Sequence, residues 1–306
     1  MAMTKMKNQS VIVAGASGVF GRHIREALTD AGHTVLGVGR GEGNEIRADL
    51  LDRDGLLRAF EGIKADVVVH AATALRKPPM THKGMFGTDD LRVTGTANLI
   101  EAAKLAGVRR FIGENVAVGY GYRDFGDRVL TEADEFGASV TDPNINRHLE
   151  GMREKERLPR ESGLEAISLR FGFFYGPGGT ETMVHMLRKR QLPAFNDHGH
   201  ISPWTHLADA AAAVVAAIDR GRPGEAYNVV DDHMGFGEMI RAIAETFGTP
   251  KPFTVPTWMM AVAPYMHLML GVTMRVSSEK ARRELGWQPA YATVLDGLRA
   301  QALGHV

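Results

Sequence analysis

The feature that most constrains the fold is a set of three glycines, Gly15, Gly18 and Gly21, placed between two segments of different periodicity. An apolar, β-branched run at residues 10–14 precedes them, and residues 20–31 follow with helical spacing of apolar side chains. Gly15 permits a tight turn, Gly18 lets backbone amides approach a phosphate, and Gly21 lets helix and strand pack closely. This order is typical of a dinucleotide-binding loop, because the helix N-terminus adds partial positive charge.

Strand-like runs alternate with helical patterns through the first two thirds of the 306-residue chain. The run DVVVHA at 66–71 is continuously apolar, as expected for a strand covered on both faces of a sheet. A helix is predicted over 89–106, ending at Gly107, and further strands are predicted at 34–38, 110–114 and 165–170. The alternation predicts an α/β fold of the Rossmann type, a doubly wound parallel sheet.

After Phe171 the alternation is lost, and proline, glycine, aromatic residues and methionine become frequent. A helix at 205–220 and a strand at 226–230 are expected to return to the sheet. The remaining residues predict a smaller C-terminal substrate lobe over the carboxyl ends of the strands. The expected division is a dinucleotide-binding domain of residues 8–170 plus 205–231 and a substrate-binding lobe of residues 171–204 plus 232–306.

Composition excludes several classes of protein. The 36 basic and 36 acidic residues give no net charge, which argues against a nucleic-acid binder. The absence of cysteine excludes disulfides and thiolate metal sites, and fits a cytoplasmic location. The polar first ten residues predict no secretory signal, and residues 256–272 fall short of the roughly 20 that a bilayer requires. We therefore expect no membrane partner, and a buried or cleft-lining helix at 256–272.

The end of the second predicted strand indicates which cofactor is bound. An acidic residue there would bind the ribose hydroxyls of NAD, but this chain has Arg40, which can pair with the 2′-phosphate of NADP. NADP is therefore favoured over NAD, the alternative being that Arg40 is a solvated loop residue. The predicted cofactor contacts are Gly15, Ser17, Gly18, Val19, Phe20, Gly21, Arg40, Asp49 (at the adenine), Leu50, Ala71, Ala72 and Thr73.

Motifs along nearly the whole chain resemble those of the extended short-chain dehydrogenase/reductases, in the NAD-dependent epimerase/dehydratase family. They are GASGVFG, ADL, VVVHAAT, VTGTANLIEAA, LRFGFFYGPG, WTHLADAAAAVVAAI and ARRELGWQPAY. The resemblance implies a Rossmann fold, a nicotinamide cofactor and a small-molecule substrate. Members of the family often form dimers, so a homodimer remains open.

The sequence departs from that family at its catalytic residues, which are a Tyr with a Lys four positions later and a Ser or Thr after the fifth strand. None of the six tyrosines has such a lysine, and residues 97–130 contain neither Ser nor Thr. By register, the Tyr position holds Asn144 or Ile145, and the Lys position holds Arg147, His148 or Leu149.

Four residues remain as candidates for proton transfer, and each has a structural alternative. Glu114 and Asn115 end the fifth strand, Tyr120 follows closely, and His148 titrates near neutral pH. Glu114 could instead bond loop amides, and His148 could be a solvated helix residue. No metal is expected, because His198 and His200 alone form too small a ligand set.

The substrate lobe favours a small, neutral, apolar molecule. Phe173 stands where the family often has an asparagine near a nucleotide sugar, so a nucleotide sugar is disfavoured. Two functions fit the sequence. One is an NAD(P)-dependent oxidoreductase or epimerase/dehydratase with a non-standard proton donor. The other is a catalytically silent NADP-binding sensor or interaction protein.

Overall fold

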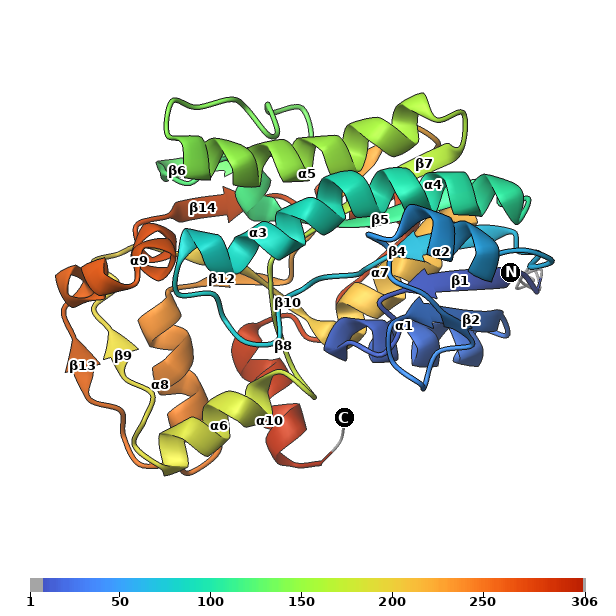
Figure 1. Ribbon diagram of the computed structural model, residues 1–306. Helices are drawn as coiled ribbons and strands as arrows, with labels where there is room; N and C mark the ends of the chain where they lie inside the picture. The colour runs from blue at the N-terminus through green and yellow to red at the C-terminus, as the bar shows by residue number, and fades with distance from the viewer. Residues whose placement is uncertain (1–7, 305–306) are drawn as a thin grey trace.

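The computed structural model describes residues 8–304 and contains a seven-stranded, all-parallel sheet with the strand order β11-β7-β5-β4-β1-β2-β3 (Figure 1). This sheet confirms the predicted Rossmann-type fold. Seven of the first ten residues, on which the absence of a secretory signal was predicted, lie outside the described range. The strands are β1 (Ser10–Ala14), β2 (Thr34–Gly39), β3 (Ile46–Arg47), β4 (Val67–His70), β5 (Arg110–Val116), β7 (Glu165–Phe171) and β11 (Ala226–Val229).

Helices cover both faces of the sheet, which explains why its strands are apolar on both sides. Val11 and Val13 of β1 pack toward one layer of helices, while Ile12 and Ala14 pack toward the other. The first layer holds α1 (Val19–Asp30) and α7 (Leu207–Arg220). The second layer holds α2 (Arg53–Ala59), α4 (Thr96–Leu105) and α5 (Pro143–Glu161).

The helix predicted over 89–106 begins earlier than expected. It starts as α3 (His82–Asp90), widens into the π-helical turn η1 (Leu91–Gly95) and continues as α4. The hydroxyl of Thr81 caps its first turn by accepting the N–H of Gly84, at 3.3 Å. This turn is polar in sequence, so apolar periodicity could not reveal it. Gly107 has the expected left-handed conformation, with φ +77°.

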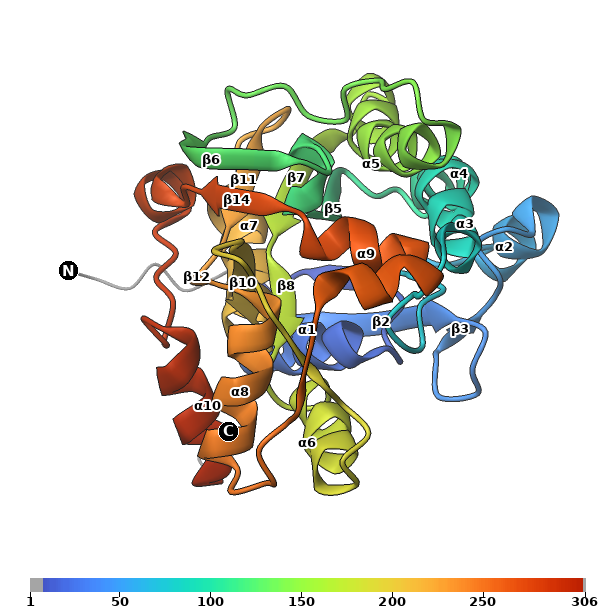
Figure 2. The same ribbon diagram turned by 90° about the vertical axis from the view of Figure 1, so that its left-hand side faces the viewer.

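The C-terminal lobe is built around a three-stranded sheet, in the order β12-β10-β8. Thr205 and His206 end strand β10, so the helix predicted from residue 205 begins two residues later, at Leu207. Figure 2 shows a two-stranded parallel sheet, in which β6 lies beside β14. The elements of this region are β6 (Asp124–Leu130), β8 (Phe173–Tyr175), α6 (Thr180–Arg188), β9 (Ala194–Phe195), β10 (Ser202–His206), β12 (Asp232–Met234), α8 (Phe236–Thr246), β13 (Thr254–Val255), β14 (Thr273–Val276) and α10 (Val294–Ala302).

Residues 256–272 do not form the single buried helix that was expected. They form a 3₁₀ helix, η3 (Thr257–Val262), and a short α-helix, α9 (Pro264–Leu270), separated at Ala263 by a non-helical backbone. Trp258 is 71% exposed, whereas Tyr265 is buried. The expectation was therefore wrong for the first half of the segment. The two other short helices are η2 (Ala117–Tyr120) and η4 (Ala281–Leu285). None of the helices within residues 8–304 combines the length and apolarity that a bilayer crossing requires.

Candidate functional site

The glycine turn between β1 and α1 has room only for glycine at two of its three positions. Gly15 has φ +88°, and a Cβ atom there would lie 2.7 Å from Cα of Ala72 and 2.8 Å from the carbonyl oxygen of Ala71. A Cβ atom on Gly21 would overlap the carbonyl oxygen of Gly15. The turn therefore lies directly against the end of β4, as the cofactor prediction requires.

The exposed part of the turn forms the N-terminus of α1. Gly18 caps the helix, the first turn contains no acidic side chain, and Ser17, Gly18 and Val19 are exposed. This arrangement suits an anion, because unpaired backbone N–H groups and the helix dipole meet there. Phe20 and Leu50 are buried in the core, so only their backbone groups are available to a ligand.

A cavity of about 290 Å³ lies beside the end of β2 and is lined by Arg40, Arg47, Ala48, Asp49, Asp52 and Gly55. Nη1 of Arg40 lies 3.8 Å from Oδ2 of Asp49, and both side chains are exposed enough for this ion pair to be weak. Arg47, on β3, is a second cation at this cavity that sequence reasoning missed. Its position two residues before Asp49 could have revealed it.

Three of the four candidates for proton transfer form hydrogen bonds to residues of α5, β7 or β11. Oε2 of Glu114 accepts a bond from Nζ of Lys155 at 2.8 Å. Burial lowers the pKa of that lysine, against the opposing effect of Glu114. The amide nitrogen of Asn115 donates to the carbonyl oxygen of Met152 at 2.9 Å.

Tyr120 belongs to a further network. Its hydroxyl donates to Oδ1 of Asn228 at 2.8 Å and accepts from Nη1 of Arg170 at 2.9 Å. Burial raises the pKa of Tyr120 to about 12, although Arg170 opposes the shift. The Tyr120 hydroxyl thus has one donor and one acceptor partner inside the fold.

His148, the fourth candidate, is fully buried and lies in the middle of a polar chain. Its Nδ1 is 2.6 Å from Oδ2 of Asp89, and its Nε2 is 3.0 Å from Nδ1 of His82. The two imidazole rings stack at a centroid distance of 5.3 Å. Nη1 of Arg92 donates to the other oxygen of Asp89, at 3.3 Å. The chain runs from a buried carboxylate on α3, through α5, to the half-buried His82.

Two tyrosines enclose the histidine pair. The ring of Tyr265, on α9, lies edge-on to His82 and to His148, at centroid distances of 5.8 and 5.3 Å. Its hydroxyl is 3.3 Å from that of Tyr122. Burial lowers the pKa of His82, and the neighbouring His148 lowers it further. Apart from His148, sequence reasoning missed all of these residues, since no motif marks them.

The other residues at the family's catalytic positions lie elsewhere on α5. Asn144 and Ile145 form its first turn, where their backbone N–H groups donate to the side chain of Asp142 at 2.9 Å. Nη2 of Arg147 donates to Oδ1 of Asp90 at 2.6 Å, and Leu149 is buried. Of the five residues at these positions, only His148 is a buried titratable group.

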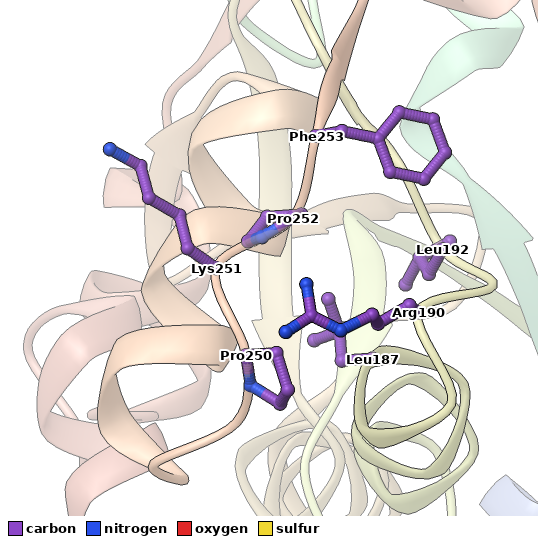
Figure 3. Close-up of a pocket in the computed structure, with 7 residues that line it drawn as sticks. All are labelled: Leu187, Arg190, Leu192, Pro250, Lys251, Pro252 and Phe253. Carbon is purple, nitrogen blue, oxygen red and sulfur yellow. The ribbon is translucent and has the colours of Figure 1, made fainter.

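A separate cavity of about 200 Å³ lies in the C-terminal lobe, between the end of α6 and the segment after α8 (Figure 3). It shares no lining residue with the glycine turn or with the histidine chain. In Figure 3 the Arg190 side chain lies near Leu187 and the two prolines, Pro250 and Pro252, while Lys251 points away.

Comparison with known proteins gives the family. The family model described as "NAD dependent epimerase/dehydratase family" matches residues 11–230. The chain is 32% identical to the 3-diazoavenalumate denitrifying reductase of Streptomyces sp, over 94% of this chain and 98% of that protein. It is 25% identical to a 3 beta-hydroxysteroid dehydrogenase/Delta 5-->4-isomerase of Mycobacterium tuberculosis, over 92% and 87% of the two chains.

Solved structures share the fold. A human epimerase family protein with NADPH superposes with a TM-score of 0.79 at 19% identity, covering 96% of this chain and 99% of that one. The UDP-glucose 4-epimerase of Thermus thermophilus, in complex with NAD, gives 0.75 at 22% identity, covering 96% and 97%. The family match and the shared fold agree with the glycine turn and the parallel sheet. This chain is a member of the NAD-dependent epimerase/dehydratase family.

Proposed function

We propose that the protein is an NAD(P)-dependent enzyme, a reductase or an epimerase/dehydratase, that acts on a small, neutral, largely apolar molecule. The observation that carries this proposal is the glycine turn, in which Gly15 abuts Ala71 and Ala72 while residues 17–19, at the N-terminus of α1, are exposed. A side chain at Gly15 or Gly21 would collide with neighbouring backbone atoms and displace this turn. The exposed N-terminus of α1, with no acidic side chain in its first turn, fits the diphosphate of a dinucleotide. When bound, a nicotinamide cofactor supplies or accepts a hydride.

NADP is the cofactor we favour. Arg40 and Arg47 both line the cavity at the end of β2, where two guanidinium groups can bind a 2′-phosphate. Their present partners compete weakly, since Arg40 pairs with Asp49 at 3.8 Å and Arg47 with Glu42 at 3.9 Å, both at exposed sites. Asp49 also remains our candidate for the adenine contact, and Leu50 and Thr73 remain proposed contacts.

The proton source we favour is His148. Glu114, Asn115 and Tyr120 are each held by buried partners, whereas His148 connects through His82 to the partly exposed side of α3. An imidazole ring can donate a proton from one nitrogen and accept one at the other, as proton transfer at this position requires.

A cluster of aromatic side chains in the C-terminal lobe supports an apolar substrate. Phe173 packs between Trp204 and Phe236, at centroid distances of 5.6 and 5.0 Å, and belongs to the same apolar cluster as Tyr122 and Tyr265. The reductase and the steroid dehydrogenase among the relatives are named for substrates without a nucleotide. A nucleotide sugar is therefore disfavoured, although UDP-glucose epimerases are also among the relatives.

Calorimetry and a turnover assay test this function together. We expect NADPH to bind and to be oxidised by at least one class of a panel of aromatic aldehydes, alicyclic ketones and arenediazonium salts. The last class is included because one relative is named for the reduction of a diazo compound. NADPH that binds but is not oxidised by any class would contradict the reductase.

That outcome would favour the second candidate, an NADP-binding sensor. The observations that support it are the missing Tyr–Lys pair and the packing of Tyr265 against Tyr122 and both histidine rings. A cytoplasmic location and a homodimer also remain proposals, which cell fractionation and sedimentation would test.

A further inference from the structure

We propose that His82 is the residue that hands a proton to the substrate, and that His148 and Asp89 hold and resupply that proton. This inference rests on the proposed function and deepens it, because it places the direct proton donor on α3 and leaves His148, on α5, to supply it with protons.

The bonding order of the three side chains supports a relay. Asp89 accepts from Nδ1 of His148, and Nε2 of His148 faces Nδ1 of His82. Each ring nitrogen of the buried His148 therefore has one partner. Within residues 8–304, Nε2 of His82 makes no hydrogen bond, and this half-buried ring is the exposed end of the chain.

The charges of the chain fit the same roles. Burial and the neighbouring His148 keep the pKa of His82 below its ordinary value, so that His82 is mostly neutral at pH 7. An imidazolium at His148 would be paired with Asp89, which lies 2.6 Å away. The charged and titratable groups that face the two rings are Asp89, Arg92, Tyr122, Asp142 and Tyr265.

Proton transfer through this chain balances. In the loaded state His148 carries protons on both nitrogens and His82 carries one on Nε2. The substrate oxyanion takes the proton from Nε2 of His82, while the proton on Nε2 of His148 moves to Nδ1 of His82. His148 ends neutral, with its Nδ1–H still bonded to the carboxylate of Asp89, and solvent later returns one proton.

Helix α3 places Asp89 and its histidine partners near the segment that follows β4, which the glycine turn also contacts. Oγ1 of Thr88, the residue before Asp89, lies 3.2 Å from Oγ1 of Thr73 and accepts the N–H of Ala74 at 3.2 Å. Thr73 directly follows Ala71 and Ala72, which abut Gly15. One short segment thus connects the cofactor cradle to the helix that carries His82 and Asp89.

Comparison of two acceptors separates proton supply from all other roles. A ketone or aldehyde takes up a hydride and a proton on reduction to an alcohol. An arenediazonium cation takes up a hydride alone, as its C–N bond breaks and N₂ leaves with the electron pair. We expect His82→Gln to slow carbonyl reduction roughly 100-fold or more, while NADPH affinity and diazonium reduction change less than about twofold.

Two further variants complete the test. His82→Ala should regain carbonyl turnover when free imidazole is added, because the site is partly open to solvent. His185→Gln, at an exposed histidine of α6, is the matched control and should leave both reactions unchanged. Equal loss with both acceptors, or no loss with either, would overturn the role of His82.

A readout without turnover keeps the relay separate from the proposed function. Ring ¹⁵N NMR of the apo protein should show a proton on Nδ1 of His148 and coupled titration of the two rings, with the coupling lost in His82→Gln. Independent titrations would overturn the relay even in an active enzyme. Coupled titration in a protein that oxidises no NADPH would confirm that the two histidines share a proton. It would contradict the reductase and overturn the role of His82 in carbonyl reduction.

Discussion

We propose that Arg40, at the end of β2, distinguishes NADP from NAD, two cofactors that differ by a single phosphate. Arg40→Ala should weaken NADPH binding roughly tenfold or more, because a hydrogen bond to a charged group contributes about 1.5–3 kcal/mol. The affinity for NADH should stay the same. Arg47→Ala should act in the same direction, since both guanidinium groups line one cavity. Calorimetric titration of both nucleotides measures the effect.

The exposed Arg58 of α2 provides a control of equal charge, because it does not line that cavity. If Arg58→Ala weakens NADPH as much as Arg40→Ala, the effect is one of overall charge and the phosphate site is refuted. Equal losses of affinity for NADPH and for NADH in Arg40→Ala would also refute the phosphate site.

At the scale of elements, we propose that cofactor binding depends on the N-terminus of α1. Gly18→Asp places a carboxylate at the helix cap, where the expected ligand is a diphosphate, and should weaken NADPH binding at least tenfold. Gly18→Asn has the same shape without the charge and should weaken it less. Calorimetry with both variants, each checked for an unchanged melting temperature, isolates the charge. Equal affinities for the two variants would contradict a phosphate at this helix.

Elements differ in how well the sequence predicted them, for physical reasons. Strands β1 and β7 were placed to within one residue, because a buried apolar run has few other readings. The start of α3 was missed because its first turn is polar. The prediction of a buried helix at 256–272 was partly wrong, because apolar composition does not reveal exposure and Trp258 lies on the surface.

The glycine turn was predictable because its three glycines and the strand and helix beside them are adjacent in the chain, although Ala71 and Ala72 also constrain Gly15. The chain of Asp89, His148 and His82 was not, because it joins α3 to α5 and has no fixed spacing. Register with the family pointed to His148 alone. Its partners required the tertiary structure, as did the finding that Glu114 pairs with Lys155.

For the whole molecule, the buried junction of the sheet and the C-terminal lobe should control how stability depends on pH. Asp231 lies there, and burial raises its pKa to about 8, while the bond from the backbone N–H of His206 opposes the shift. Asp209, Asp232 and Arg282 also act on this carboxyl group. His206 shows the opposite effect, because burial lowers its pKa to about 4 and the neighbouring His23 lowers it further.

The two shifts act in opposite directions on stability, so they largely cancel between about pH 4 and 6.5, and the effect of Asp231 remains above that range. The native state binds the proton of Asp231 more tightly than the unfolded chain does, so its contribution is lost as the pH rises from about 4 to about 8. The contribution of neutral His206 is lost as the pH falls from about 6.5 to about 4. Each group alone can give a slope of at most about 1.4 kcal/mol per pH unit.

Asp231→Asn keeps an oxygen for the N–H of His206 but cannot ionise. Urea unfolding should therefore show that wild type loses stability between pH 6 and 8, in roughly the range where Asp231 ionises, and that Asp231→Asn does not. Parallel curves for the two proteins would show that Asp231 ionises as easily in the native state as in the unfolded chain.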